Sequence, residues 1–341
     1  MIKKKTQIQI LSFFLFIVMA LAGIIISLLI VSSAKNLSFA KIFVYFFKAT
    51  IIRPSGILNT LAKTTPLLIV SLGLLVAFKT SVWNIGAEGQ MAMGIIATLC
   101  VTLNMSAPAL VTVILAFIIS FIVGGVWAGL AGVAKAKWNV PEIPMTLMQN
   151  FVAMAIMAYM ISGPLMTTEP GYARTAFIPE NLRFPFIKDP LNTTFLFALA
   201  LIPIIYWLMN KSVLGYKLSA TGDNPRAAAI AGLHPKKMII IAMVISGGIS
   251  ALAGTCLIVG EYFFGVSGLT SHYGFYAIIC VLLAGGKVGL VPLTSFFVAF
   301  VLMGSSAITN VGVPGPFVNL TMGIVFIAAL ARIIFEKAVF K

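Results

Sequence analysis

The hydrophobic positions along this 341-residue chain form long continuous runs, with few of the alternations that mark half-buried strands. Most runs approach the roughly 20 apolar residues that a helix needs to cross a bilayer. The pattern predicts about ten membrane-crossing helices, near 10–32, 58–78, 86–104, 108–134, 143–162, 192–209, 238–259, 273–286, 289–309 and 317–335. We therefore expect an all-α polytopic membrane protein whose residues 1–341 form a single transmembrane domain.

Composition agrees with this interpretation. Hydrophobic residues make up 60% of the chain and charged residues 9%, whereas soluble domains carry roughly 25% charged residues. The three cysteines lie in apolar runs without CxxC spacing, so we expect neither disulfides nor a metal site. The first apolar stretch, residues 8–31, exceeds the 7–15 residues of a signal-peptide core, which favours an uncleaved first helix.

The net charge of +15 has an explanation in topology. If the N-terminus is cytoplasmic, alternate crossing places fifteen of the 23 lysines and arginines on the cytoplasmic side. This excess has the sign that the positive-inside rule requires, and both termini are then cytoplasmic. We therefore expect membrane lipid around the protein and no nucleic-acid partner. Two loops are long: an external loop, 163–190, and a cytoplasmic loop, 211–237.

The cytoplasmic loop contains the stretch "ATGDNPRAAAIAGLHPKK". Gly222 is expected to interrupt the chain, and Asp223 or Asn224 to cap a helix whose first turn holds Pro225. Gly232 would then end this helix in the left-handed conformation. A helix of about two turns is unstable alone in water, so a second protein is expected to dock against it. The alternative is a simple connector between two spans.

Polar residues also occur within the apolar runs, where they are costly and need partners. The stretch "WNIGAEGQMAMG" contains Asn84, Glu88 and Gln90 among three glycines, and a separate span contains Gln149 and Asn150. The glycines predict an interrupted helix. These five residues are candidates for the path of a small polar solute. Alternatively, Glu88 holds the interruption together by accepting backbone N–H bonds, or it pairs with Lys79.

Four ordered motifs resemble the permease subunits of ATP-binding-cassette (ABC) importers for branched-chain amino acids, simple sugars and nucleosides. The stretch "GDNPRAAAIAG" resembles their coupling-loop motif, and "WNIGAEGQ" resembles the "FNIGAEGQ" of the nucleoside and sugar branch. "VPEIPMTLMQN" and "GFYAIICVLLAGG" resemble two further motifs of that branch, with Pro141 in place of asparagine and Tyr276 in place of aspartate. The resemblance covers about residues 60–310.

The resemblance implies a bundle like that of the vitamin-B12 permease, the type II importer fold, in the inner membrane of a prokaryote. It implies nucleosides as the solute, with simple sugars or branched-chain amino acids as alternatives; an ion-coupled secondary transporter is a second alternative. The residues implied in coupling to the ATPase are Gly222, Asp223, Asn224, Pro225, Ala227, Ala228, Ala231 and Gly232.

The resemblance also implies three protein partners: an ATP-binding-cassette ATPase, a second permease subunit and a substrate-binding lipoprotein. The sequence has no match to the phosphate-binding pattern GxxxxGK[ST]. We therefore expect a transport subunit without enzymatic activity and without a cofactor of its own, with Mg-ATP bound by the ATPase.

Overall fold

The computed structural model describes residue 18 and residues 21–33, 38–316, 318–324, 326 and 327. The expected first and last spans, 10–32 and 317–335, therefore lie partly outside the described residues, as do the two termini.

Helices form nearly all of the regular structure in the described part of the chain. The α-helices are α2 (Phe39–Phe47), α3 (Pro54–Lys79), α4 (Ala87–Asn104), α5 (Ala109–Trp138), α6 (Glu142–Ser162), α7 (Thr194–Lys211), α8 (Val213–Asp223), α9 (Pro225–Ile230), α10 (Pro235–Leu257), α11 (Tyr273–Leu283) and α12 (Val291–Ala307). An apolar helix also covers Leu21–Ser33. The π-helical segments are η1 (Lys48–Ile52) and η3 (Ile258–Tyr262), and the 3-10 segments are η2 (Glu180–Leu182), η4 (Val288–Leu290) and η5 (Ile308–Val311).

Six of the described helical segments are long and apolar enough to cross a membrane. They are Pro54–Lys79, Ala109–Trp138, Glu142–Ser162, Thr194–Lys211, Pro235–Tyr262 and Val288–Asn310. The chain is therefore a polytopic, mainly helical membrane protein. The predicted total of ten spans and the type II arrangement stay predictions.

One expected span, 273–286, is shorter in the structure than the sequence suggested. Helix α11 has 11 residues, or about 16 Å at 1.5 Å per residue, roughly half the thickness of the hydrocarbon layer. A turn with positive φ at Gly285 and Gly286 ends it, so α11 does not cross the bilayer by itself.

The described chain separates into two compact units. Unit 1 comprises Met1–Leu61 and Phe297–Lys341, and unit 2 comprises Ala62–Phe296. In the described part of unit 1, the α2 residue Phe46 meets Phe300 edge to face, with ring centroids 5.4 Å apart. A side chain on Gly304 would overlap the same ring, so this glycine lets α12 approach α2 closely.

Helix α10 forms the centre of unit 2 and packs against both α4 and α5. A Cβ atom on Gly94 of α4 would overlap the backbone of Ala251, and one on Gly124 of α5 would lie 2.6 Å from the Gly247 carbonyl oxygen. Ser120 Oγ donates a 3.1 Å hydrogen bond to the Ala251 carbonyl oxygen. Small residues therefore bring three backbones together, as is typical of helices in lipid.

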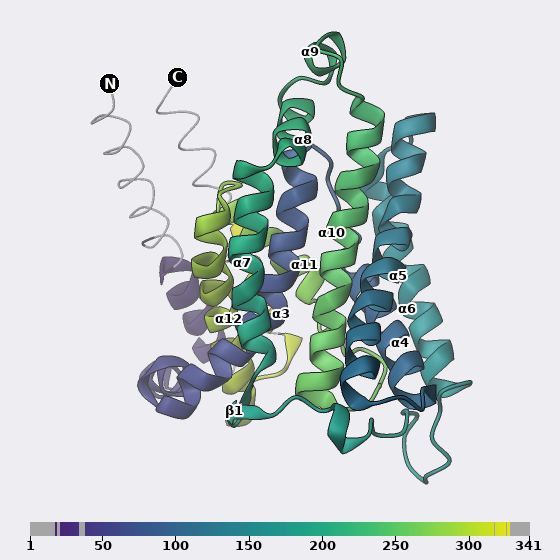
Figure 1. Cartoon of the computed structure of the whole chain (residues 1–341). Helices are drawn as coiled ribbons and strands as arrows, with labels where there is room; N and C mark the ends of the chain where they lie inside the picture. The colour runs from purple at the N-terminus through teal and green to yellow at the C-terminus, as the bar shows by residue number, and fades with distance from the viewer. Residues whose placement is uncertain (1–17, 19–20, 34–37, 317, 325, 328–341) are drawn as a thin grey trace. The chain divides into compact units, whose positions relative to one another are not determined.

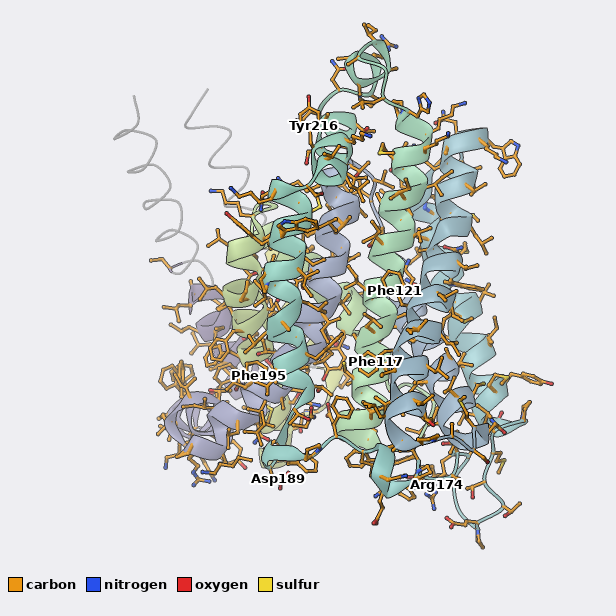
Figure 2. The ribbon with its side chains drawn as sticks, viewed as in Figure 1. Phe117, Phe121, Arg174, Asp189, Phe195 and Tyr216 are labelled. Atoms are coloured by element: carbon orange, nitrogen blue, oxygen red, sulfur yellow. The ribbon has the colours of Figure 1, made fainter. Side chains whose placement is uncertain are left out.

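The two long loops lie at opposite ends of unit 2. Figure 1 shows α8 and α9 at one end and strand β1 (Phe186–Lys188) at the other. In Figure 2, Tyr216 of α8 lies at the first end, and Arg174 and Asp189 of the 163–190 loop lie at the second. That the 163–190 and 211–237 loops face opposite sides of the membrane stays a prediction.

The 163–190 loop is fixed to the segment that follows η3. Strand β1 pairs antiparallel with β2 (Leu191–Asn192), placing Phe186 opposite Asn192. Backbone N–H groups of the loop bind the segment after η3 at two points: Ile178 donates to the Phe263 carbonyl at 2.8 Å, and Thr175 to the Gly265 carbonyl at 3.0 Å. The loop therefore has a defined conformation on the face of unit 2 opposite α9.

Candidate functional site

The predicted interruption lies between α3 and α4. Helix α3 ends at Lys79 and α4 begins at Ala87, with Ser81 in the left-handed conformation between them. Asn84 is fully buried in this link. Its Oδ1 accepts a 3.0 Å bond from the Gly86 N–H, and its amide exchanges hydrogen bonds of 2.9 and 3.0 Å with the Gln90 amide. Asn84 and Gln90 thus satisfy each other and the local backbone.

Two further helices hold the link in place. Asn84 Nδ2 also donates to Ser246 Oγ of α10 at 2.9 Å. On α6, Asn150 donates to the Ile85 carbonyl at 2.9 Å and accepts from the Gly89 N–H at 2.8 Å. Asn150 therefore supplies partners for two of the backbone groups left free at the interruption. Free backbone groups at membrane depth require partners of this kind.

The glycines of the link permit these close approaches. A Cβ atom on Gly86 would lie 2.9 Å from Gln90 Nε2, and one on Gly89 would lie 2.9 Å from Asn150 Cα. Larger residues would push α6 and the amide pair away from the backbone that they bind.

Glu88 binds a different part of the chain. Its two carboxylate oxygens accept hydrogen bonds from the backbone N–H groups of His272 at 3.0 Å and Gly274 at 2.7 Å. These groups lie at the N-terminus of the short helix α11, where the helix dipole favours a negative charge. The Glu88 side chain is buried, with 3% of the residue exposed. It therefore fixes a helix start by accepting backbone N–H bonds, as one of the three sequence interpretations expected, although the helix is α11 and not α4.

Lys79 lies away from this carboxylate. A Cβ atom built on Gly286, at the turn that ends α11, would lie 3.6 Å from Lys79 Cε. Its positive charge thus lies near the C-terminus of α11, where the dipole favours cations. The short helix α11 has Glu88 at one end and Lys79 near the other.

Gln149 is separate from the other four candidates. Its Nε2 atom donates to the Trp127 carbonyl of α5 at 2.9 Å. Gln149 Oε1 and Trp127 Nε1 are both buried and have no hydrogen-bond partner among the described residues. The structure therefore brings Asn84, Glu88, Gln90 and Asn150 to one interruption, and places Gln149 between α5 and α6.

The sequence interpretation did not single out an ion pair in unit 2. Lys63 Nζ of α3 lies 2.7 Å from Glu261 Oε1 of η3. Both residues belong to helices that are long and apolar enough to cross a membrane. The available signal was a charged residue inside each of two apolar runs, but the runs gave no indication that these charges pair.

The 211–237 loop differs from the expectation at its start. Helix α8 continues through Gly222 to Asp223, so Gly222 does not interrupt the chain. Its lack of a side chain serves packing instead, because a Cβ atom would overlap the Lys79 carbonyl oxygen. Ser81 Oγ donates a 2.8 Å hydrogen bond to the Gly222 carbonyl, which joins α8 to the link that carries the polar cluster.

Helix α9 has the predicted ends. Asn224, and not Asp223, is the N-cap, accepting from the N–H groups of Arg226 at 3.1 Å and Ala227 at 3.0 Å. Pro225 occupies the first turn, and Gly232 has a positive φ of 82°. The ATPase-coupling candidates are exposed, except that Ala228 is buried and Gly222 is half-buried. Ile230, at the end of α9, is 90% exposed.

These features define a polytopic helical membrane protein with a polar interruption joined to an exposed helix at one end. Residues 56–330 match the family described as the permease component of branched-chain amino acid transport systems. The chain therefore belongs to this family of ABC-importer permeases, as the resemblance predicted.

Curated relatives cover most of the chain. It is 31% identical to the guanosine ABC transporter permease of Bacillus subtilis over 278 residues, 79% of each protein. It is 28% identical to the glucose ABC transporter permease of Haloferax volcanii over 305 residues, 85% of this chain and 80% of that protein. It is 27% identical to the nucleoside ABC transporter permease of Lactococcus lactis over 289 residues, 81% of this chain and 79% of that protein.

Proposed function

We propose that this chain is the transmembrane permease subunit of an ATP-driven importer, and that the imported solutes are nucleosides. The observation that carries the solute class is the similarity, at 31% and 27% identity, to permeases named for guanosine and for nucleosides. The protein then lies in the inner membrane of a prokaryote, with both termini in the cytoplasm.

Helix α9 is the proposed contact with a separate ATPase subunit, which binds Mg-ATP and supplies the energy. Its alanine-rich, exposed surface suits a groove on another protein, and Ile230, 90% exposed, provides an apolar side chain for that contact. The capping by Asn224 makes the short helix a defined element before it docks.

Closure of the ATPase would move α9 and, with it, α8. Gly222 of α8 contacts the end of α3 and accepts a hydrogen bond from Ser81. From Ser81 the link continues to Asn84 and Glu88, which bind α10 and the start of α11. The movement would therefore reach the interior of unit 2 through continuous bonded contacts. Rigid-body rearrangement of helices is an established way to expose one site alternately to either side of a membrane.

Two further partners complete the proposed importer. A second permease subunit, identical or related, would share the translocation path. A substrate-binding lipoprotein would deliver solute to the external face, where the ordered 163–190 loop is the proposed contact.

The main alternatives differ in solute. The similarity to a permease named for glucose, at 28% identity, favours simple sugars as the second candidate, and the family description names branched-chain amino acids. An ion-coupled secondary transporter is less consistent with the molecule. Such a carrier has no need for α9, and Glu88 already receives two backbone hydrogen bonds.

Uptake by the reconstituted complex tests the proposal. The permease is inserted in vesicles with its ATPase, its second permease and its binding protein, and supplied with labelled guanosine, ribose or leucine. We expect ATP-dependent accumulation of guanosine that exceeds that of ribose and leucine. Faster uptake of ribose or leucine would assign one of the alternative solutes, and uptake driven by an ion gradient without ATP would contradict the importer.

A further inference from the structure

The Lys63–Glu261 ion pair lies in unit 2 and is separate from the interruption between α3 and α4. Lys63 Nζ and Glu261 Oε1 are 2.7 Å apart, and the side chains are 28% and 25% exposed. The pair is thus neither sealed in the core nor fully exposed. One side of it remains accessible to another molecule.

The pair joins two segments that are long and apolar enough to cross a membrane. Lys63 precedes the end of α3, Lys79, by 16 residues, or about 24 Å along the helix axis. It also follows Pro54 by nine residues, about 13 Å. Lys63 therefore lies in the half of α3 away from α9, and Glu261 lies between Val259 and Phe263, whose carbonyl groups bind the 163–190 loop. Ionisable residues within membrane-crossing segments normally face a water-filled space and mark the path of a solute or ion.

Two tyrosine rings lie near the ammonium group of Lys63. Lys63 Nζ lies 5.9 Å from the ring centroid of Tyr262 and 6.0 Å from that of Tyr273. Tyr273 is buried and is the first residue of α11, so it stands at the helix start that Glu88 fixes. Tyr262 is partly exposed and ends the π-helical segment η3, a widened turn of a type often found at functional sites.

We propose that Lys63, Glu261 and Tyr262 form a subsite for the sugar part of the solute, the vicinal diol of a ribose or hexose ring. The Glu261 carboxylate would accept hydrogen bonds from two neighbouring hydroxyl groups, and the Lys63 ammonium would donate to a hydroxyl or ring oxygen. The ring of Tyr262 offers an apolar surface for the C–H face of the sugar.

This inference rests on the proposed function and deepens it. Nucleosides and free sugars share the diol. One subsite could therefore bind either of the solutes, guanosine and glucose, for which the two related permeases are named. A purely structural ion pair that ties α3 to η3 is the competing interpretation. It predicts that loss of the pair slows transport of every solute by the same factor.

The test compares two solutes within one preparation. The complete reconstituted importer is supplied with guanosine or 2′,3′-dideoxyguanosine, each at a concentration that saturates the binding protein. The ratio of the two maximal uptake rates then reports on the permease and does not depend on how much of it is folded. Glu261→Gln and Lys63→Gln are measured beside the wild type. The matched control is Glu142→Gln, which breaks the 2.9 Å pair of Glu142 with Lys135 elsewhere in unit 2.

We expect the wild type and the control to import guanosine faster than the dideoxy compound. Either test variant should slow guanosine uptake by about tenfold, because a hydroxyl group loses its charged partner, and should leave dideoxyguanosine uptake within about twofold. An unchanged ratio in both variants, or a wild type that does not distinguish the two solutes, would overturn the subsite alone. A wild-type complex that imports neither guanosine nor ribose would overturn the proposed function and the subsite with it.

Discussion

The carboxylate of Glu88 accepts a 2.7 Å hydrogen bond from the backbone N–H of Gly274, a residue 186 positions later in the sequence. A side chain on Gly274 would overlap the backbone of Glu88, so the two segments touch directly. The start of α4 and the start of α11 therefore form one junction, in which a buried charge faces the positive end of a short helix.

Glu88→Gln tests the role of this junction. Glutamine has one acceptor oxygen where glutamate has two, so one of the two N–H groups loses its partner and remains buried. We expect the free energy of unfolding to fall by about 1–3 kcal/mol, and uptake of all solutes to fall by a common factor. Thermal unfolding of the purified complex, together with uptake kinetics at matched protein level, measures both. A variant with wild-type stability and a raised KM for one solute would show that Glu88 contacts that solute.

Asn150 and Gln149 are neighbours on α6 with different predicted importance. Asn150→Ala removes the partner of the Ile85 carbonyl and of the Gly89 N–H at once. Gln149→Ala removes one hydrogen bond to the Trp127 carbonyl and also an unpartnered oxygen. We expect Asn150→Ala to destabilise the protein by about 1–3 kcal/mol for each group left without a partner, and Gln149→Ala by clearly less. Measuring the free energy of unfolding of both variants tests this difference. Equal losses of stability in the two variants would contradict the assigned role of Asn150.

The sequence predicted the helices of this fold better than its junctions. Long apolar runs locate α5, α6 and α10 because a membrane imposes length and hydrophobicity on any helix that crosses it. The sequence indicated that Glu88 could accept backbone N–H bonds, but it could not place these donors at the start of α11, because no residue type marks such groups. The pairing of Lys63 with Glu261 joins residues 198 positions apart and leaves no local pattern.

Glycine roles were predicted in part. Positive φ at Gly232 follows from its position after an alanine-rich helix. Gly222 was expected to break the chain, whereas it lies within α8 against the Lys79 carbonyl. A glycine that permits a tertiary contact and one that ends a helix look the same in sequence, because both lack only a side chain.

Gly94→Ala tests the packing at the centre of unit 2. The added methyl group would overlap the backbone of Ala251, which cannot rotate away as a side chain can. We expect a loss of about 1–3 kcal/mol in stability and a lower melting temperature in detergent. Gly289→Ala is the control, because a Cβ atom there meets nothing within 4 Å. Equal melting temperatures for the two variants would contradict the close approach of α4 and α10.

Gly232→Leu tests the docking of α9. Gly232 has a φ of 82° and open space around it, so leucine costs about 1–2 kcal/mol in backbone strain and adds bulk at the proposed contact. We expect normal membrane insertion, but loss of co-purification with the ATPase and loss of transport. Gly268→Leu is matched in φ, at 86°, and in free space, but belongs to the segment between η3 and α11. It should retain the ATPase. If both variants retain it, α9 is not the docking element.

Ser81→Ala tests whether the movement of α9 reaches the polar interruption. The variant removes only the hydrogen bond from Ser81 Oγ to the Gly222 carbonyl, and leaves α8, α9 and the Asn84–Gln90 pair intact. The measured quantity is the amount of solute imported per ATP hydrolysed. A typical hydrogen bond contributes about 0.5–1.5 kcal/mol, so we expect this amount to change by about two- to tenfold. We expect it to fall while ATP hydrolysis continues and the ATPase still co-purifies.

Ser162→Ala is the control. It removes a hydrogen bond to the Ala158 carbonyl at the C-terminal end of α6, and the amount of solute imported per ATP should not change. If Ser81→Ala imports as much solute per ATP as the wild type, the movement of α8 is transmitted by the backbone contact of Gly222 with Lys79 and not by the hydrogen bond from Ser81.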